Sequence, residues 1–272
     1  MNYMLAAIGI MLAGGMLSLS LRRWPWAMSL AGPSSVMIGC ILGLVPAVAS
    51  MASGSSVEFS LSWDLPIGAL RLGLDPLSAF FAIPILLVSA LSALYGIGYL
   101  KRSGNRRNIG LQWFLFNLLA ASMVLVVLAR NAVIFLLAWE IMALSSFFLV
   151  TFENERAEVR RAGWIYLVAA HIGTAFLLIL FLLLGRSAGS LDFDKFNLAG
   201  ASSSVATTAF LLAVIGFGVK AGFMPLHVWL PEAHPAAPSH VSAVMSGVMI
   251  KTGIYGFLRV LAYLGTPLEW WG

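Results

Sequence analysis

Cysteine is nearly absent from this chain of 272 residues, which contains only one. That residue, Cys40, lies in an apolar run. A disulfide framework, a CxxC redox motif and a cysteine-ligated iron–sulfur cluster each need more than one thiol, so the sequence excludes all three. We therefore expect no redox centre and no cofactor in this chain.

Charge is also scarce. Only 10% of the residues are charged and 60% are hydrophobic, which is more apolar surface than one soluble core can bury. The composition predicts an all-α, polytopic membrane helical bundle. The formal net charge of +5 does not indicate nucleic-acid binding, because the basic residues sit in short loops between apolar runs, where they set membrane orientation.

Several catalytic signatures are missing as well. The sequence contains no glycine-rich phosphate loop, no nucleophile elbow and no paired acid and base carboxylates. His227, His234 and His240 lie close together in sequence, but prolines interrupt them, and their spacings do not match a helical or finger-type ligand set. We expect no metal site.

Apolar runs of sufficient length predict about eight transmembrane helices. Alternating hydrophobicity over 57–63 predicts a short strand or hairpin in an external loop. We divide the chain into 1–109, with the first three helices and this loop, and 110–272, with the other five. The expected helices cover residues 3–20, 27–51, 76–99, 110–129, 132–151, 162–184, 205–232 and 239–264.

The seventh apolar run has 28 residues, more than the ~20 that a straight spanning helix needs. Pro225 and Pro231 lie inside it, and two further prolines follow. An interrupted helix is tolerated in a membrane where protein or a water-filled cavity receives its freed backbone groups. We therefore expect this helix in two pieces, with the break between about Lys220 and Pro225.

Lysine and arginine are unevenly divided between alternate loops. Nine lie in the loops after the first, third and fifth helices, and four lie in the loops after the second, fourth and sixth. The positive-inside rule places the richer set of loops in the cytoplasm. We expect a multi-pass protein of the cell's inner (cytoplasmic) membrane, with both termini on the non-cytoplasmic side.

Four ionisable side chains fall near the middle of the predicted membrane: Glu140, His171, Lys220 and Lys251. Burying each lysine or glutamate charge at the centre of a bilayer costs ~2.5–3.5 kcal/mol, so these groups are expected to pair or to meet water. A buried lysine loses its proton more readily, and a nearby carboxylate reverses this effect. A Lys220–Glu140 pair would thus be a switchable proton site, with Lys251 as the next station of a relay.

The alternative is that Glu140 and Lys220 form a static ion pair that holds two helices together. His227 and His240 lie near the polar ends of the broken region and are further relay candidates. His171 is a third, although a histidine on an apolar helix is more often an interhelical hydrogen-bond partner.

Three segments also resemble a known family. They are LDPLSAFF at 74–81, WEIMALSSFFLV around Glu140, and the run 218–256 that begins GVKAGFMPLHVWLPEAHP and ends SGVMIKTGIYG. Together they closely resemble the antiporter-like proton-translocating membrane subunits of respiratory complex I (NADH-quinone oxidoreductase), Mrp-type cation/proton antiporters and energy-converting hydrogenases. The last segment is most similar to the formate hydrogenlyase and hydrogenase-4 type of membrane subunit.

The resemblance implies relay roles for Glu140, Lys220 and Lys251. It implies partners among the other membrane subunits of a respiratory or hydrogenase-like complex, with lipid around them. Members of this family have about fourteen helices that include two inverted repeats, and this sequence matches the first repeat. We therefore expect a partner to cover the face on which the second repeat would pack, or a reduced relative with altered transport.

Three functions remain open at this level. The first is a non-catalytic, proton-translocating subunit of a redox-driven oxidoreductase complex. The second is a subunit of an Mrp-type cation/proton antiporter, which has no redox chemistry. The third is a membrane scaffold that keeps the fold without pumping.

Overall fold

The structure is a computed structural model that describes residues 1–21, 24–61, 69–102, 109–198, 202–265 and 271. Within these ranges eight helical segments are long and apolar enough to cross a membrane, which confirms the predicted all-α, multi-pass architecture. The helices are α1 (Asn2–Ser20), α2 (Pro25–Ser53), α3 (Pro76–Arg102), α4 (Ile109–Leu128), α5 (Ala132–Val150), α6 (Ala157–Ala188), α7 (Ser203–Ala221), α8 (Leu230–Ala236), α9 (Ser239–Val244) and α10 (Ile250–Leu264).

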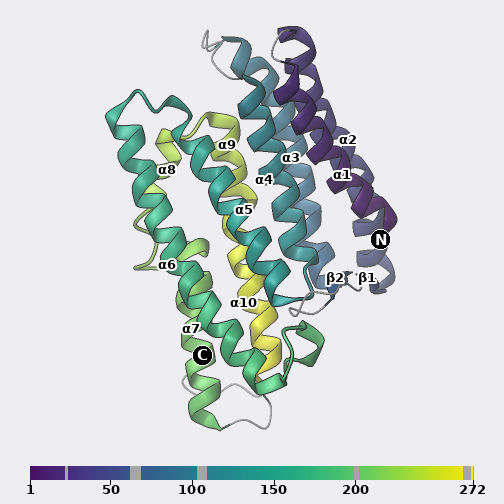
Figure 1. The fold of residues 1–272 in the computed structure, drawn as a ribbon, viewed down its shortest axis with the longest axis vertical. Helices are drawn as coiled ribbons and strands as arrows, with labels where there is room; N and C mark the ends of the chain where they lie inside the picture. The colour runs from purple at the N-terminus through teal and green to yellow at the C-terminus, as the bar shows by residue number, and fades with distance from the viewer. Residues whose placement is uncertain (22–23, 62–68, 103–108, 199–201, 266–270, 272) are drawn as a thin grey trace.

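The bundle is organised around α4, the most enclosed of the spans. It packs against α1, α2 and α3 on one side and against α5 and α10 on the other. Beyond α5 the chain continues through α6 and α7, and α7 returns to pack on α10 (Figure 1). The N-terminal helices and the later helices therefore form one continuous bundle through α4.

A two-stranded antiparallel hairpin lies at the right of Figure 1, below the N-terminal helices. Its strands are β1 (Val57–Leu61) and β2 (Leu70–Leu74). The strand prediction is confirmed for 57–61, and the remainder of the predicted range, 62–63, lies outside the described residues. The start of α1 and the end of α10 lie toward the same end of the bundle as the hairpin (Figure 1).

The seventh helix is broken where the sequence predicted. Helix α7 ends at Ala221, and Gly222 follows with φ of 75°, a left-handed conformation that glycine adopts without strain. Residues 224–229 form turns, and α8 then begins at Leu230. The indole Nε1 of Trp229 donates a 2.7 Å hydrogen bond to the carbonyl of Val219, so one carbonyl freed by the break is satisfied internally.

The second piece of this helix differs from the prediction. It ends at Ala236 rather than at residue 232, because Pro231 stands at the first turn of α8, where a missing N–H costs nothing, and Pro235 falls in its last turn. Pro225 lies in the irregular segment. Of the two prolines expected to mark the break, only Pro225 does so.

The eighth span also contains a feature that the sequence did not predict. Between α9 and α10 the chain forms one π-helical turn, Met245–Met249. A π turn shifts the register of the backbone hydrogen bonds and is frequent at functional sites. The turn ends two residues before Lys251.

Candidate functional site

Lys220 lies in the last turn of α7 and is only 3% exposed. Its Nζ donates a 2.9 Å hydrogen bond to the hydroxyl of Tyr166 on α6. The same ammonium group lies 5.3 Å from the ring centroid of Tyr166 and 5.9 Å from that of Trp139 on α5. Ring faces attract a cation at this range, so the cationic form of Lys220 is held by two aromatic rings and one hydroxyl.

The hydroxyl of Tyr166 continues the contact toward α5. It lies 2.5 Å from the Oγ of Ser146, and Ser146 also donates to the carbonyl of Met142 at 2.7 Å. The ring of Tyr166 packs against Trp229, with centroids 5.0 Å apart. Lys220 is therefore connected to α5 through hydroxyl groups and is enclosed by aromatic side chains.

The expected ion pair between Glu140 and Lys220 is wrong. The Oε2 of Glu140 instead lies 3.4 Å from the Nε2 of His171 on α6, and no ion pair joins it to Lys220. Successive residues of an α-helix point about 100° apart, so when Trp139 faces Lys220, its neighbour Glu140 turns toward the outer face of α6. His171 is thus an interhelical partner, and its Nδ1 lies 2.9 Å from the carbonyl of Leu167.

The Glu140–His171 pair lies at the surface of the bundle. The side chain of His171 is 50% exposed and that of Glu140 is 27% exposed. The second carboxylate oxygen of Glu140 is buried and has no hydrogen-bond partner among the described atoms. The pair therefore carries unused hydrogen-bonding capacity on a face that a membrane environment would surround with lipid.

Lys251 lies on the exposed face of α10. Its Nζ donates a 2.5 Å hydrogen bond to the carbonyl of Ser246, which belongs to the π turn. His234 on α8 lies nearby, with its Nδ1 3.0 Å from the Oγ of Ser242. Burial lowers the pKa of His234, and the charge of Lys251 lowers it further.

The two other histidine candidates lie apart from these lysines. His240 is buried between α3, α4 and α9, where its Nε2 lies 3.3 Å from the Nε2 of Gln112 and aromatic rings surround it. His227 lies in the exposed turns before α8. The sequence predicted no relay role for His234, but the structure places it near Lys251. His234 and its partner Ser242 are eight residues apart, and this spacing matches no pattern from which their contact could be predicted.

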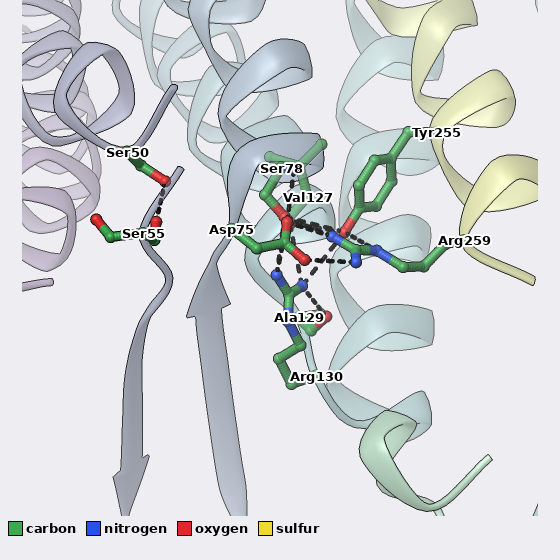
Figure 2. Close-up of polar contacts among 9 residues, drawn as sticks. All are labelled: Ser50, Ser55, Asp75, Ser78, Val127, Ala129, Arg130, Tyr255 and Arg259. Carbon is green, nitrogen blue, oxygen red and sulfur yellow. Dashed lines mark hydrogen bonds and ion pairs between the residues drawn. The ribbon is translucent and has the colours of Figure 1, made fainter. Parts of the chain in front are cut away.

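A second polar cluster lies at the hairpin end of the bundle (Figure 2). Asp75 at the start of α3 accepts hydrogen bonds of 2.6 Å from both Nη atoms of Arg259 on α10. The guanidinium of Arg130 lies 3.3 Å from the same carboxylate, and the hydroxyl of Ser78 accepts from both arginines at 2.9 Å. Although burial opposes it, the hydrogen bonds from Arg259 and the charge of Arg130 hold the pKa of Asp75 below its ordinary value.

The sequence predictions missed this cluster. Arg259 is a basic residue within an apolar helix, so the rule that drew attention to Lys251 applies to it equally. Asp75 lies in the segment LDPLSAFF, which entered the sequence analysis only through the family resemblance. Tyr166 and Ser146 were also missed, because hydroxyl groups are common on apolar helices and carry no distinct signal.

Among the residues that the structure describes, no three His, Cys, Asp or Glu side chains lie close enough together to hold a metal ion.

Comparison with known proteins gives three consistent results. The family described as NADH:quinone oxidoreductase/Mrp antiporter, TM, matches residues 129–271. Hydrogenase-4 component B of Escherichia coli (strain K12) is 41% identical over 250 residues, which are 90% of this chain and 37% of that protein. Formate hydrogenlyase subunit 3 of the same strain is 32% identical over 240 residues, 86% of this chain and 38% of that protein.

Two solved structures share the fold. The Mrp complex from Dietzia sp. DQ12-45-1b aligns with a TM-score of 0.80 and 27% identity, over 96% of this chain and 28% of that chain. The membrane-bound sulfane sulfur reductase, an archaeal respiratory membrane complex, aligns with a TM-score of 0.77 and 25% identity, over 94% of this chain and 41% of that chain. The chain thus spans less than half the length of these relatives.

Proposed function

The chain belongs to the NADH:quinone oxidoreductase/Mrp antiporter family of membrane proteins, and on that basis we propose that it is a proton-translocating membrane subunit of a multi-subunit, redox-driven complex of the hydrogenase or complex I-like type. Electron transfer belongs to the partner subunits in this proposal. The observation that carries it is Lys220, a lysine that is 3% exposed at the break of a membrane helix. A charge at this depth is costly and is usually retained for function.

In the proposed relay, Lys220 binds and releases the translocated proton. The Glu140–His171 pair on α5 and α6 is a second site that can exchange a proton, since it joins a carboxylate to an imidazole at 3.4 Å. Lys251 is the onward station beside the π turn, and His234 on α8 lies near enough to feel its charge. His227 and His240 are further candidates for proton uptake.

The uptake side is proposed to lie near α8. A pocket of about 200 Å³ opens between the start of α6 and α8, and it is lined by polar side chains that include Arg156, Glu158 and Glu232. Ala162 also lines this pocket and stands one helical turn before Tyr166. Water in this pocket would lie within one turn of α6 from Tyr166, whose hydroxyl contacts Lys220.

The proposed location is the inner membrane, with the hairpin end outside the cytoplasm. The turn between α5 and α6, which contains Arg156, and the first turn of α6, which contains Arg160, lie at the opposite end of the bundle from the hairpin (Figure 1). Basic residues favour the cytoplasmic side, so this arrangement supports a non-cytoplasmic position for both termini.

We also propose membrane partner subunits on two faces. Lys251 is exposed on α10, and the Glu140–His171 pair is half-exposed on α5 and α6. Ionisable groups facing lipid are costly, whereas the same groups are tolerated against protein or water.

The test is proton uptake by vesicles that contain the purified complex. Lys220→Ala is expected to abolish uptake driven by electron donor, and Lys195→Ala, in the loop before α7, is expected to leave it unchanged. Normal uptake by a fully assembled Lys220→Ala complex would contradict the relay and favour a structural scaffold.

A cation/proton antiporter subunit is the second candidate, and the alignment with the Mrp complex favours it. An imposed sodium gradient distinguishes the two. Proton movement driven by that gradient alone, without electron donor, would identify the antiporter.

A further inference from the structure

We infer that Tyr166 is a positioning residue for Lys220, and that the hydroxyls of Tyr166 and Ser146 form a reversible hydrogen-bond chain that stabilises Lys220 both with and without its transported proton. This inference rests on the proposed relay and assigns the partner of its central lysine. This hydrogen-bond chain runs from Lys220 on α7 through Tyr166 on α6 to Ser146 on α5. It takes the place of the carboxylate that the sequence predicted beside Lys220.

All three members of the chain are enclosed. Lys220 is 3% exposed, Tyr166 is 1% exposed and Ser146 is 0% exposed. The Nζ of Lys220 lies 2.9 Å from the hydroxyl of Tyr166, which lies 2.5 Å from the Oγ of Ser146. At these distances each contact is a hydrogen bond, and water has no direct access to compensate for the loss of one.

When Lys220 is charged, its ammonium group determines which group donates and which accepts in each hydrogen bond. An ammonium group can only donate, so Tyr166 accepts from Lys220. The single hydroxyl hydrogen of Tyr166 is then free to point to Ser146, and Ser146 donates to the carbonyl of Met142 at 2.7 Å. Both hydroxyl hydrogens in this arrangement have an acceptor.

When Lys220 is neutral, the donor and acceptor roles along the hydrogen-bond chain can reverse. A neutral amine has a lone pair, so the hydroxyl of Tyr166 can rotate and donate to it. Ser146 then donates to Tyr166 and gives up its bond to the Met142 carbonyl. The transported proton first leaves through another N–H of Lys220 to the next group of the proposed relay. The neutral amine then turns its lone pair toward Tyr166 and the two hydroxyl hydrogens rotate, so the reversal itself breaks no covalent bond.

The other described neighbours of Lys220 cannot stabilise both its charged and its neutral form. The rings of Trp139 on α5 and Tyr166 on α6 attract only the cation. The indole N–H of Trp229, from the segment before α8, is used by the carbonyl of Val219. Glu140 on α5 and His171 on α6 pair with each other, and Lys251 on α10 bonds to the backbone of the π turn.

Tyr166→Phe removes one hydroxyl and keeps the ring that packs on Trp229. We expect this variant to lower proton translocation by the assembled complex at neutral pH about tenfold, since a hydrogen bond to a charged group is worth roughly that factor or more. The pH of half-maximal rate is expected to fall, because the hydrogen bond that the protonated lysine loses is charge-assisted and stronger than the one that the neutral amine loses. Tyr95→Phe, on the exposed face of α3, is the matched control and should change neither quantity.

Ser146 provides a second and independent variant. Ser146→Ala leaves Tyr166 without its second partner, whereas Ser146→Thr keeps a hydroxyl and should restore the wild-type pH profile. Ser145→Ala is the control, because Ser145 is equally buried and bonds only to the carbonyl of Met142 at 3.2 Å. A merely structural role of Ser146 would change assembly and leave the pH profile as it is.

The outcomes separate the inference from the proposed function. If Lys220→Ala is inactive and both Tyr166→Phe and Ser146→Ala keep the wild-type rate and pH profile, the hydroxyl chain is wrong and the relay stands. If Lys220→Ala pumps normally, both are wrong. A loss of rate with a shifted pH profile in either hydroxyl variant supports the chain.

Discussion

The carboxylate of Asp75, at the start of α3, accepts two hydrogen bonds of 2.6 Å from the guanidinium of Arg259, near the end of α10. The two residues are 184 positions apart in sequence. Arg130, in the link between α4 and α5, lies 3.3 Å from the same carboxylate (Figure 2). One acidic group therefore ties the third, fourth and last membrane spans together at the hairpin end.

Loss of this carboxylate should destabilise the bundle. Asp75→Asn leaves two largely buried guanidinium groups without their counter-charge, and breaking such a pair costs about 3 kcal/mol. Asp194→Asn is the matched control, because the Asp194 side chain is 45% exposed and its ion pair with Arg71 should contribute less than about 1 kcal/mol. Unfolding in mixed detergent micelles measures both, and equal losses for the two variants would contradict the assignment.

The same pair predicts the response to acid. The folded-state pKa of Asp75 lies below its value in the unfolded chain, so the folded state binds this proton less readily. The stabilisation is therefore fully present above the unfolded pKa of about 3.9 and declines as the pH falls below it toward the folded pKa. Melting temperatures in detergent should fall more steeply below about pH 4 for the wild type than for Asp75→Asn. If the melting temperatures of the two proteins fall in parallel, another carboxylate dominates the loss of stability in acid.

Glu140 and His171 should act as a unit in transport. We expect Glu140→Gln and His171→Leu each to reduce proton uptake, and the double variant to be no slower than the slower single variant, since each change breaks the same contact. The expected coupling is about 1 kcal/mol, roughly fivefold in rate. Thr174→Ala, one turn along α6, is the control. Rate losses that multiply would mean that the two residues act separately.

Trp229 is predicted to hold the broken end of α7 in place. Trp229→Phe removes the N–H that donates to the Val219 carbonyl at 2.7 Å, leaving a buried acceptor unsatisfied at a cost of about 1–3 kcal/mol. Trp164→Phe serves as the comparison, because Trp164 is 62% exposed. Protease sensitivity of residues 222–229 in detergent should rise for Trp229→Phe alone, and its absence would argue that the indole bond is dispensable.

Close approach of α7 and α10 requires glycine at position 253. A Cβ there would lie 2.8 Å from the backbone oxygen of Phe217 and from the backbone nitrogen of Ala221, neither of which can move aside easily. Gly253→Ala should therefore destabilise the protein by about 1–3 kcal/mol. Gly98→Ala has nothing within 4 Å and should be neutral or slightly stabilising. Thermal unfolding of the two variants provides the measurement, and equal stability would exclude tight packing at this crossing.

The spans and the break were predictable because they depend on local properties. A run of about 20 apolar residues suffices to define a membrane helix, whatever its neighbours are. Gly222 and Pro225 interrupt α7 through their own backbone preferences, which is why the break lies where the sequence placed it. The alternation in β1 likewise identified the hairpin strand over 57–61.

The position of an ionisable residue within an apolar run also predicts its depth in the membrane, so Glu140, Lys220 and Lys251 could be identified as candidates. The residues that they contact could not be predicted in this way. Neighbouring residues on a helix point about 100° apart, and small rotations decide which of them faces another helix. Depth alone therefore did not distinguish a carboxylate beside Lys220 from a tyrosine.

The sequence by itself determined that this is a membrane bundle of eight spans with a broken seventh helix and lysines at membrane depth. Only the tertiary structure decided that Lys220 meets Tyr166 and Ser146, that Glu140 meets His171, and that Asp75 meets Arg259. The physical reason is that hydropathy and backbone preference act over a few neighbouring residues, whereas these contacts depend on how three or more helices rotate and pack against one another.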